Sequence, residues 1–317
     1  RPPRSTLFPY TTLFRSIGLM FALFGYLWFM MTPVQDLLSL QYAYSNAKAA
    51  LERLNTLFAL DQEPVCHHDQ NPFTHKSASV RVEGLNFSYS NEQHVLKDIN
   101  MKIDAGAKIA LIGPSGSGKT TLAKVLSGFY PPKEGNLYFN GVSLYDIGLE
   151  NLRNNLFVVL QQPVLFNDTL RFNLTMGDDY SDEEVLDALK IAQLSGFVSE
   201  IPDGLQTLVG KGGVRLSGGQ KQRLSIARMI LSNPSVVIFD ESTSALDVHT
   251  ESDLFAALQE FLKERTIITI AHRLSTVQNS DYIYVMQDGR IVEEGDPKVL
   301  MKEEGHYNRF VRSQHTV

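Results

Sequence analysis

The chain has 317 residues, of which 43% are hydrophobic and 20% charged, and its formal net charge is −6. This length accommodates one large globular domain with an appendage. The negative charge, without a long run of Lys or Arg, argues against nucleic acid as the main partner. The single cysteine, Cys66, excludes an internal disulfide framework and suits a reducing cytosol.

Residues 1–16 (RPPRSTLFPYTTLFRS) show neither helical nor strand periodicity. They resemble the translation of a widely used short-read sequencing adapter, in one frame across the whole segment. A secretory signal peptide is the alternative, with Arg4 and Arg15 before an apolar core, but no small-residue cleavage site follows Met31. We therefore expect residues 1–16 to be a non-native artefact and the native protein to be truncated somewhere before Ile17.

Ile17–Met31 is uncharged and would extend about 22 Å as a helix, short of the roughly 30 Å core of a bilayer. A buried helix of a soluble protein is the alternative, but Trp28, Phe29 and the paired methionines leave no polar face. We expect the inner end of a transmembrane helix whose outer part is missing.

From Pro33 to Leu60 the pattern becomes amphipathic, which predicts that the helix continues into the cytoplasm. Its apolar positions recur every three or four residues at Leu37, Leu40, Tyr44, Ala47, Leu51, Leu54 and Phe58. Residues 61–79 have the polar, proline-interrupted composition of a linker. The run 66–69 (CHHD) lacks the spacing of a zinc site, so a solvated linker is preferred to a metal site there. A second domain, residues 80–317, follows.

A short apolar strand, a glycine-rich loop and a helix follow one another in Ala107–Ile112, Gly113–Thr121 (GPSGSGKTT) and Thr120–Ser127. This context identifies a P-loop, because glycines let backbone N–H groups face phosphates and the helix N-terminus favours negative charge. Lys119 is expected to reach the β- and γ-phosphates, and the Thr120 hydroxyl to ligate Mg²⁺. The ATP-binding residues predicted in this loop are Gly113, Ser115, Gly116, Ser117, Gly118, Lys119, Thr120 and Thr121.

Val236–Asp240 (VVIFD) predicts a buried parallel strand that delivers Asp240 to its carboxyl end, where ligands bind in such sheets. Asp240 would hold Mg²⁺ through its water shell, and Glu241 would orient and deprotonate the attacking water. Acidic pairs are common at strand ends, so this interpretation depends on the P-loop.

The run Leu216–Gln220 (LSGGQ) is followed by Lys221–Arg228 (KQRLSIAR). Ser217 can cap the helix that begins there, while Gly218 and Gly219 let the backbone approach a γ-phosphate. A plain helix cap is the alternative. The position between a P-loop and an acidic strand favours a phosphate contact.

With these motifs in this order, residues 80–317 resemble the nucleotide-binding domain of an ABC transporter from end to end. The resemblance implies that the signature residues Ser217, Gly218, Gly219 and Gln220 contact ATP across a dimer interface. Each ATP would then be held by two domains.

The resemblance also implies roles for four further residues. Tyr89 in FSYS would stack on adenine, with a core aromatic of a strand as the alternative. Gln161 in VLQQP would contact Mg²⁺ and face the membrane domain, Asp247 in SALD would belong to the segment that joins the two sites, and His272 in IAHRLST would bind the γ-phosphate. The predicted catalytic residues are Glu241, His272, Lys119 and Gln161, and the predicted metal-binding residues are Thr120, Gln161 and Asp240.

One departure from the family pattern is Val209–Gly213 (VGKGG), in which Lys211 and Gly212 stand where exporters usually carry Glu-Arg. In the family this stretch contacts the coupling helices of the membrane domain. The departure therefore concerns coupling rather than hydrolysis.

We expect an α/β P-loop NTPase fold of the ABC type, with parallel strands around the P-loop. A β-rich edge subdomain, Val80–Ile103, would carry Tyr89, and a helical subdomain, about residues 168–228, would present the signature. The end of a transmembrane helix would precede this domain.

The resemblance predicts an ATPase of the exporter type that uses ATP and Mg²⁺ and couples dimer closure to export. Its location would be a cell membrane, of which the bacterial inner membrane is the favoured one, and its nucleotide-binding domain would lie in the cytoplasm. Its partners would be the lipid bilayer, a membrane domain missing upstream, and a second nucleotide-binding domain, a homodimer being favoured over a heterodimer. The sequence does not identify the cargo.

Three alternatives stand beside this hypothesis. An importer ATPase or a soluble ABC protein would have no fused membrane domain, and Ile17–Leu60 argues against it. A P-loop kinase would have no use for the LSGGQ motif. Finally, this fragment could bind ATP without hydrolysing it or transporting anything, because the rest of its membrane domain is absent.

Overall fold

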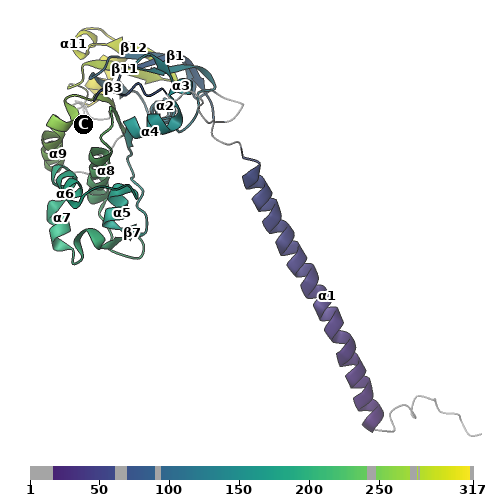
Figure 1. Ribbon diagram of the computed structural model, residues 1–317. Helices are drawn as coiled ribbons and strands as arrows, with labels where there is room; N and C mark the ends of the chain where they lie inside the picture. The colour runs from purple at the N-terminus through teal and green to yellow at the C-terminus, as the bar shows by residue number, and fades with distance from the viewer. Residues whose placement is uncertain are drawn as a thin grey trace, which may run out of the picture. The chain divides into compact units, whose positions relative to one another are not determined.

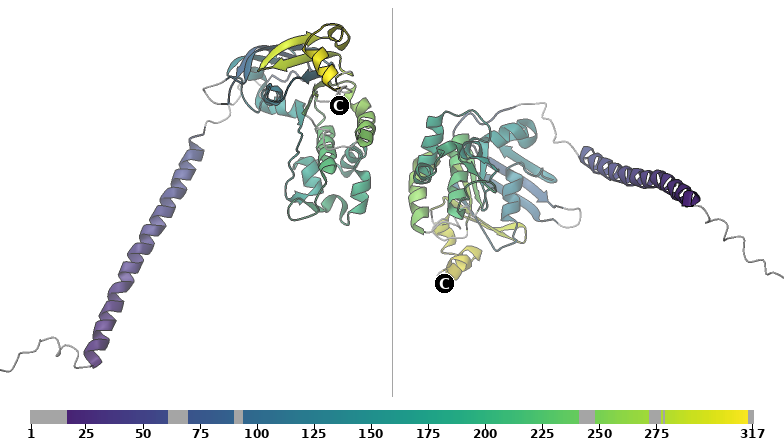
Figure 2. Two further views of the ribbon diagram at one scale, coloured as in Figure 1. Left: turned by 180° about the vertical axis from the view of Figure 1, so that it is seen from behind. Right: turned by 90° about the horizontal axis from the view of Figure 1, so that it is seen from below.

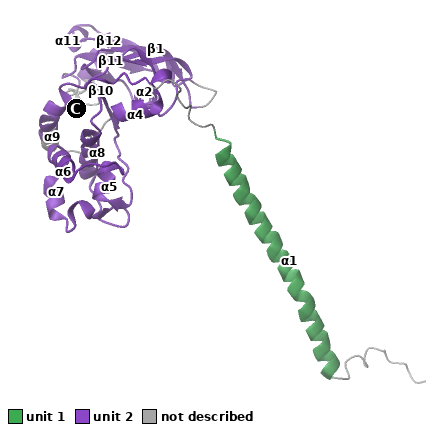
Figure 3. Cartoon of the chain, in the orientation of Figure 1, with its two compact units in different colours: residues 1–64 green, residues 65–317 purple. Residues whose placement is uncertain are grey.

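The structure, a computed structural model, describes residues 17–60, 70–89, 94–240, 248–271, 277 and 279–314. The chain divides into two units, Arg1–Pro64 and Val65–Val317, coloured separately in Figure 3. The boundary between these units falls within the predicted linker, residues 61–79.

The first unit contains one long helix, α1 (Ile17–Phe58, 42 residues), with no buried residue. At 1.5 Å per residue α1 is about 63 Å long. By length and composition it could cross a membrane, with a mean hydropathy of 1.7 over 18 residues. Pro33 lies inside α1 and does not end it, although a proline cannot donate to the carbonyl four residues earlier. The hydroxyl of Thr32, the residue before this proline, donates to the Trp28 carbonyl (3.2 Å).

The second unit is built on a six-stranded sheet, seen in Figures 1 and 2. Its strands lie in the order β12 (Arg290–Gly295), β11 (Tyr282–Gln287), β3 (Lys108–Ile112), β10 (Thr266–Ile270), β9 (Val236–Asp240) and β6 (Leu156–Val159). Neighbouring strands are parallel except β11 and β12. Ile270 pairs with Leu111 on one side and with Asp240 on the other, so these strands end at one edge.

A four-stranded antiparallel sheet forms the predicted β-rich edge. Its order is β2 (Leu96–Ile103), β1 (Val80–Phe87), β4 (Glu134–Phe139) and β5 (Val142–Ser143). The prediction covered β1 and β2 only, and the later strands β4 and β5 complete the sheet. In β1, alternate residues such as Val80 and Val82 are buried while Arg81 and Glu83 are not, as expected for a sheet with one core face.

The helical subdomain gathers α5, α6, α7 and α8 away from the antiparallel sheet, as Figure 1 shows. Its elements are β7 (Asp168–Thr169), α5 (Leu170–Thr175), α6 (Asp182–Ile191), α7 (Ser195–Glu200), a 3-10 turn (Gly204–Gln206), β8 (Leu208–Val209) and α8 (Gly218–Ser232). The remaining helices are α2 (Lys119–Leu126), α3 (Leu144–Ile147), α4 (Leu149–Asn155), α9 (Val248–Leu262), α11 (Pro297–Leu300) and α12 (His306–Gln314). The predicted fold class, a P-loop NTPase fold with these two subdomains, is confirmed.

Two large apolar clusters hold the second unit together. One joins the two sheets to α2 and includes the fully buried Leu111, Leu122 and Phe139. The other joins β6 and β9 to the helical subdomain and includes Leu189 and Leu224. Since α8 contributes to the second cluster, the signature at its start is carried by a helix that is fixed in the core.

Residues 70–79, the described part of the predicted linker, pack against the rest of this unit. The Phe73 ring lies 5.7 Å from that of Phe139. The His75 carbonyl accepts from the Ser235 hydroxyl (2.8 Å), and the Ala78 carbonyl accepts from the Thr266 hydroxyl (2.7 Å).

Candidate functional site

The P-loop connects β3 to α2 and requires glycine at its first position. Gly113 has a φ of 148°, and a Cβ there would lie 2.1 Å from the carbonyl oxygen of Met286. A side chain at this position would therefore force the loop away from β11. The predicted sequence of strand, glycine loop and helix is confirmed.

The Lys119 ammonium lies inside this loop. Its Nζ donates to the carbonyls of Gly113 (2.8 Å) and Pro114 (2.9 Å), with the Ser117 hydroxyl at 3.5 Å, and the residue is 5% exposed. Three oxygen atoms thus hold the cation at the N-terminus of α2. A fixed positive charge beside a helix N-terminus is a favourable environment for phosphate.

Two of the predicted metal-binding residues lie side by side at the edge of the parallel sheet where β9 ends. The Thr120 hydroxyl, in the first turn of α2, donates to Oδ1 of Asp240 at the end of β9 (3.3 Å). Asp240 is 7% exposed and Thr120 is exposed. A carboxylate and a hydroxyl side by side are the hard oxygen donors that Mg²⁺ prefers, so the residues fit this ion.

The third predicted metal-binding residue, Gln161, follows β6 by two positions and is exposed. Its backbone carbonyl accepts from Nε2 of Gln222 in α8 (3.4 Å). Because β6 is parallel to β9, Gln161 leaves the sheet at the edge where β9 ends in Asp240.

Tyr89 lies beyond the end of β1 and contacts the P-loop helix. Its hydroxyl shares a hydrogen bond with that of Thr121 (3.1 Å), and its ring makes edge contacts with Phe87 (5.1 Å) and Tyr130 (5.3 Å). The residue is 52% exposed, unlike a core aromatic. This placement next to the P-loop suits adenine stacking, which stays a prediction.

The signature begins α8 with a capping box. The Ser217 hydroxyl accepts from the Gln220 N–H (3.2 Å), and Oε1 of Gln220 accepts from the Ser217 N–H (2.8 Å). The predicted helix cap is therefore confirmed. Ser217 and Gly218 remain exposed, and the contact of the signature with a phosphate stays a prediction.

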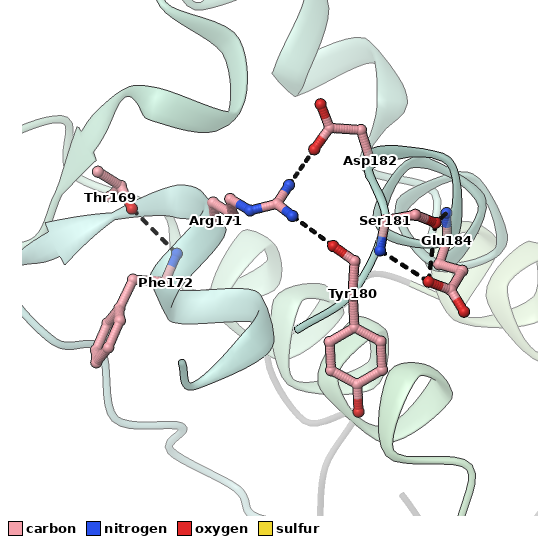
Figure 4. A network of polar contacts seen from close by, with 7 residues as sticks. All are labelled: Thr169, Arg171, Phe172, Tyr180, Ser181, Asp182 and Glu184. Atoms are coloured by element: carbon pink, nitrogen blue, oxygen red, sulfur yellow. Dashed lines mark hydrogen bonds and ion pairs between the residues drawn. The ribbon is translucent and has the colours of Figure 1, made fainter. Parts of the chain in front are cut away.

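Polar contacts at the start of α6 support α8, because α6 packs against α8. Arg171 in α5 forms an ion pair with Asp182 and donates to the Tyr180 carbonyl, as Figure 4 shows. Ser181 and Glu184 form a second capping box, and hydrogen bonds from Ser181 lower the pKa of the Glu184 carboxyl. These contacts fix the first turn of α6.

Three predicted functional residues lie outside the described residues: Glu241, Asp247 and His272. The strands β9 and β10 that precede them end at the P-loop edge of the sheet.

The turn before the signature is shaped by glycine. A Cβ on Gly213 would lie 2.0 Å from the Leu208 carbonyl oxygen, and the Gly212 N–H donates to Oδ1 of Asn167 (2.7 Å). Lys211 at its tip is exposed. This departure from the family pattern therefore forms a tight turn that displays a lysine.

Sequence reasoning missed a group of buried polar residues beneath the signature: Asn173, Gln222 and Arg228. Burial of Arg228 lowers its pKa to about 10, so it remains charged at neutral pH. The available signal was the spacing of Arg228, four residues after the buried Leu224 on the same face of α8. A cavity of about 330 Å³ lies beside Arg228, lined also by Leu160, Val164 and Phe166.

Comparisons with known proteins identify relatives of this chain. A family model described as ABC transporter matches residues 96–244. The chain is 42% identical over 284 residues to the ATP-dependent lipid A-core flippase of Chromobacterium violaceum, which covers 89% of this chain and 48% of that protein. It is 40% identical over 283 residues to an uncharacterised ABC transporter ATP-binding protein of Bacillus subtilis, over 89% of this chain and 49% of that one.

Among solved structures, a bacterial Atm1-family ABC exporter with ATP bound matches with a TM-score of 0.78 and 35% identity. The match covers 85% of this chain and 47% of that structure. The chain thus spans about half the length of the curated relatives it matches.

Proposed function

Since this chain carries a nucleotide-binding domain of the ABC transporter family and is similar to exporters over most of its length, we propose that it is part of an exporter subunit. Its ATPase cycle would drive transport across a membrane. The observation that carries this proposal is the meeting of Lys119, Thr120 and Asp240 at one edge of a parallel sheet.

In the proposed reaction Lys119 stabilises negative charge on the β- and γ-phosphates of ATP. The position of its ammonium group inside the P-loop supports this role. Thr120, Asp240 and Gln161 would hold Mg²⁺, which neutralises phosphate charge when it is bound. Glu241, next to Asp240, would accept a proton from the attacking water, and His272 would contact the γ-phosphate. Positioning and electrostatics would carry most of the catalysis.

A second copy of the domain would complete each site. The exposed Ser217 at the start of a capped helix supports a contact with ATP bound to the other copy, in which Gly218, Gly219 and Gln220 take part. Both the P-loop and the signature occur in this chain, so a homodimer can form two complete sites.

The helix α1 supports a location in a membrane, which we propose to be the bacterial inner membrane with the ATPase domain in the cytoplasm. The half of the relatives that this chain does not cover would supply the remaining membrane domain. Lipid A-core is the first cargo to test with the whole transporter, since several relatives are named as its flippases.

The proposed ATPase activity is tested with Glu241→Gln in the full chain, kept in detergent because of α1. The variant should bind ATP as the parent does, lose most turnover and accumulate as an ATP-bound dimer, measured by ATP titration, phosphate release and light scattering. Lys119→Ala is the control, since it should weaken ATP binding itself. Hydrolysis by the glutamine variant at near the parent rate would refute the role of Glu241.

A further inference from the structure

The segment 161–169, which carries Gln161, is attached to the signature helix α8 by hydrogen bonds from buried side chains to the backbone of the segment. We propose that Arg228 is a positioning residue that holds this segment and α8 together as one body. The catalytic consequence of this inference rests on the proposed function, whereas the attachment itself does not.

Arg228 reaches two separate parts of the chain. Its Nη1 donates to the Val164 carbonyl (3.0 Å), its Nε to the Asn173 carbonyl, and its Nη2 to Oδ1 of Asn173 (3.2 Å). The residue is 9% exposed. One planar guanidinium therefore links α8 both to α5 and to the segment that follows Gln161.

Asn173 extends this link along the segment. Its Oδ1 accepts from the Phe166 N–H (2.8 Å), and its Nδ2 donates to the carbonyls of Phe166 (2.9 Å) and Thr169 (3.0 Å). Asn173 is fully buried. Since its Oδ1 also accepts from Arg228, the arginine and the asparagine form one continuous hydrogen-bonded network.

Further contacts tie both ends of the segment to the signature region. At the start, Gln222 of α8 donates to the Gln161 carbonyl (3.4 Å). Near the end, Asn167 accepts from Gly212, in the turn just before the signature (2.7 Å). The segment is thus joined at its start to α8 and near its end to the turn before the signature, and the contact of Arg228 with Val164 lies between these two points.

The chemistry of this network requires an arginine. All the hydrogen bonds described for Arg228 end on neutral oxygen atoms, so no carboxylate among these acceptors neutralises its charge. The desolvation cost of the buried guanidinium is therefore offset only when all of these hydrogen bonds are formed. A lysine has one nitrogen and cannot reach the same three acceptors in the same geometry. Arg228→Lys should therefore keep the charge and loosen the attachment.

The catalytic consequence follows from the two ends of the network. Gln161 is proposed to contact Mg²⁺ in its own site, and Ser217 is proposed to contact ATP of the other site. When Arg228 holds them on one body, a movement of α8 displaces both. A loosened segment should therefore lower kcat and leave ATP binding by the P-loop unchanged.

The first test uses the parent chain in detergent and follows amide hydrogen exchange against denaturant. The Phe166 amide and the amides of α8 should lose protection together, in one cooperative opening. If Phe166 exchanges through an opening that leaves α8 fully protected, the inference is wrong. This measurement does not depend on ATPase activity.

The second test compares Arg228→Lys with Arg265→Lys. Arg265 is a matched control, because it is also buried and donates to a backbone carbonyl, that of Pro234 (3.0 Å). In Arg228→Lys the Phe166 amide should exchange about tenfold faster and kcat should fall about tenfold, the factor expected for loss of one hydrogen bond of a charged group. The dissociation constant of ATP should not change.

The control variant should be destabilised but keep the Phe166 exchange rate and kcat of the parent at temperatures where it is folded. Parent-like exchange and kcat in Arg228→Lys, or the same losses in Arg265→Lys, would overturn the inference. A parent chain without any ATP hydrolysis would instead contradict the proposed function, and the exchange results would still decide the role of Arg228.

Discussion

Ser217 has two separable roles, a helix cap that the structure contains and a phosphate contact that we propose. Replacement by Asp or Asn separates them, because both side chains cap helices about as well as Ser. Each variant should therefore retain the free energy of unfolding of the parent within about 0.5 kcal/mol, whereas Ser217→Ala should lose about 1 kcal/mol with the bond to Gln220.

The two variants should differ in turnover. At about 4 Å and an effective dielectric constant of about 20, one carboxylate charge and one phosphate charge repel by about 4 kcal/mol. At about 1.4 kcal/mol per factor of ten, Ser217→Asp should hydrolyse ATP about a thousandfold more slowly than the isosteric, neutral Ser217→Asn. Binding of ATP to the P-loop of the same chain should be equal in the two variants.

The assays are thermal unfolding, titration with a fluorescent ATP analogue, and phosphate release at saturating ATP. The comparison of Asp with Asn cancels the effects of size and of capping and leaves the charge. Equal turnover in these two variants would refute the phosphate contact. A loss of stability in both, as large as in Ser217→Ala, would refute the interpretation of the cap.

Three further predictions concern other parts of the domain. Gly113→Ala should destabilise the domain by at least about 2 kcal/mol in denaturant unfolding, because its Cβ would overlap a backbone oxygen at a left-handed φ, and parent-like stability would contradict this. Tyr89→Phe should raise the dissociation constant of ATP by less than about fivefold, since only the hydrogen bond to Thr121 is lost, whereas Tyr89→Ala should raise it by about tenfold or more in an ATP titration. Ser181→Ala should raise the pKa of Glu184 towards its ordinary value in an NMR titration. The pKa of Glu184 is lower in the folded state, so its carboxylate stabilises the fold at pH values above the unfolded pKa. This stabilisation is lost as the pH falls through the folded pKa. In Ser181→Ala the stability lost over that pH range should therefore be smaller.

The parts of the site that are local in sequence could be predicted. An apolar run located the strand that ends in Asp240, and a Ser directly before the expected helix located the cap of α8. The pairing of Thr120 with Asp240 could be anticipated because parallel strands share one edge for their carboxyl ends.

The contacts that join distant segments could not be predicted in this way. Arg228 and Val164 are 64 positions apart, and nothing in either local pattern points to the other. The polar composition of residues 61–79 predicts a linker, but the carbonyls of His75 and Ala78 accept side-chain hydrogen bonds from the domain. Backbone acceptors are independent of residue type, so composition carries no signal for them.

The acceptor that Arg228 uses in the segment after Gln161 is the main-chain oxygen of Val164, while the Val164 side chain is 66% exposed and lines the neighbouring cavity. Every amino acid offers the same oxygen at that point. A substitution at Val164 therefore changes a side chain that lines this cavity and keeps the hydrogen bond between Arg228 and the backbone. The shape and polarity of the cavity can thus change during evolution while the segment stays attached to α8.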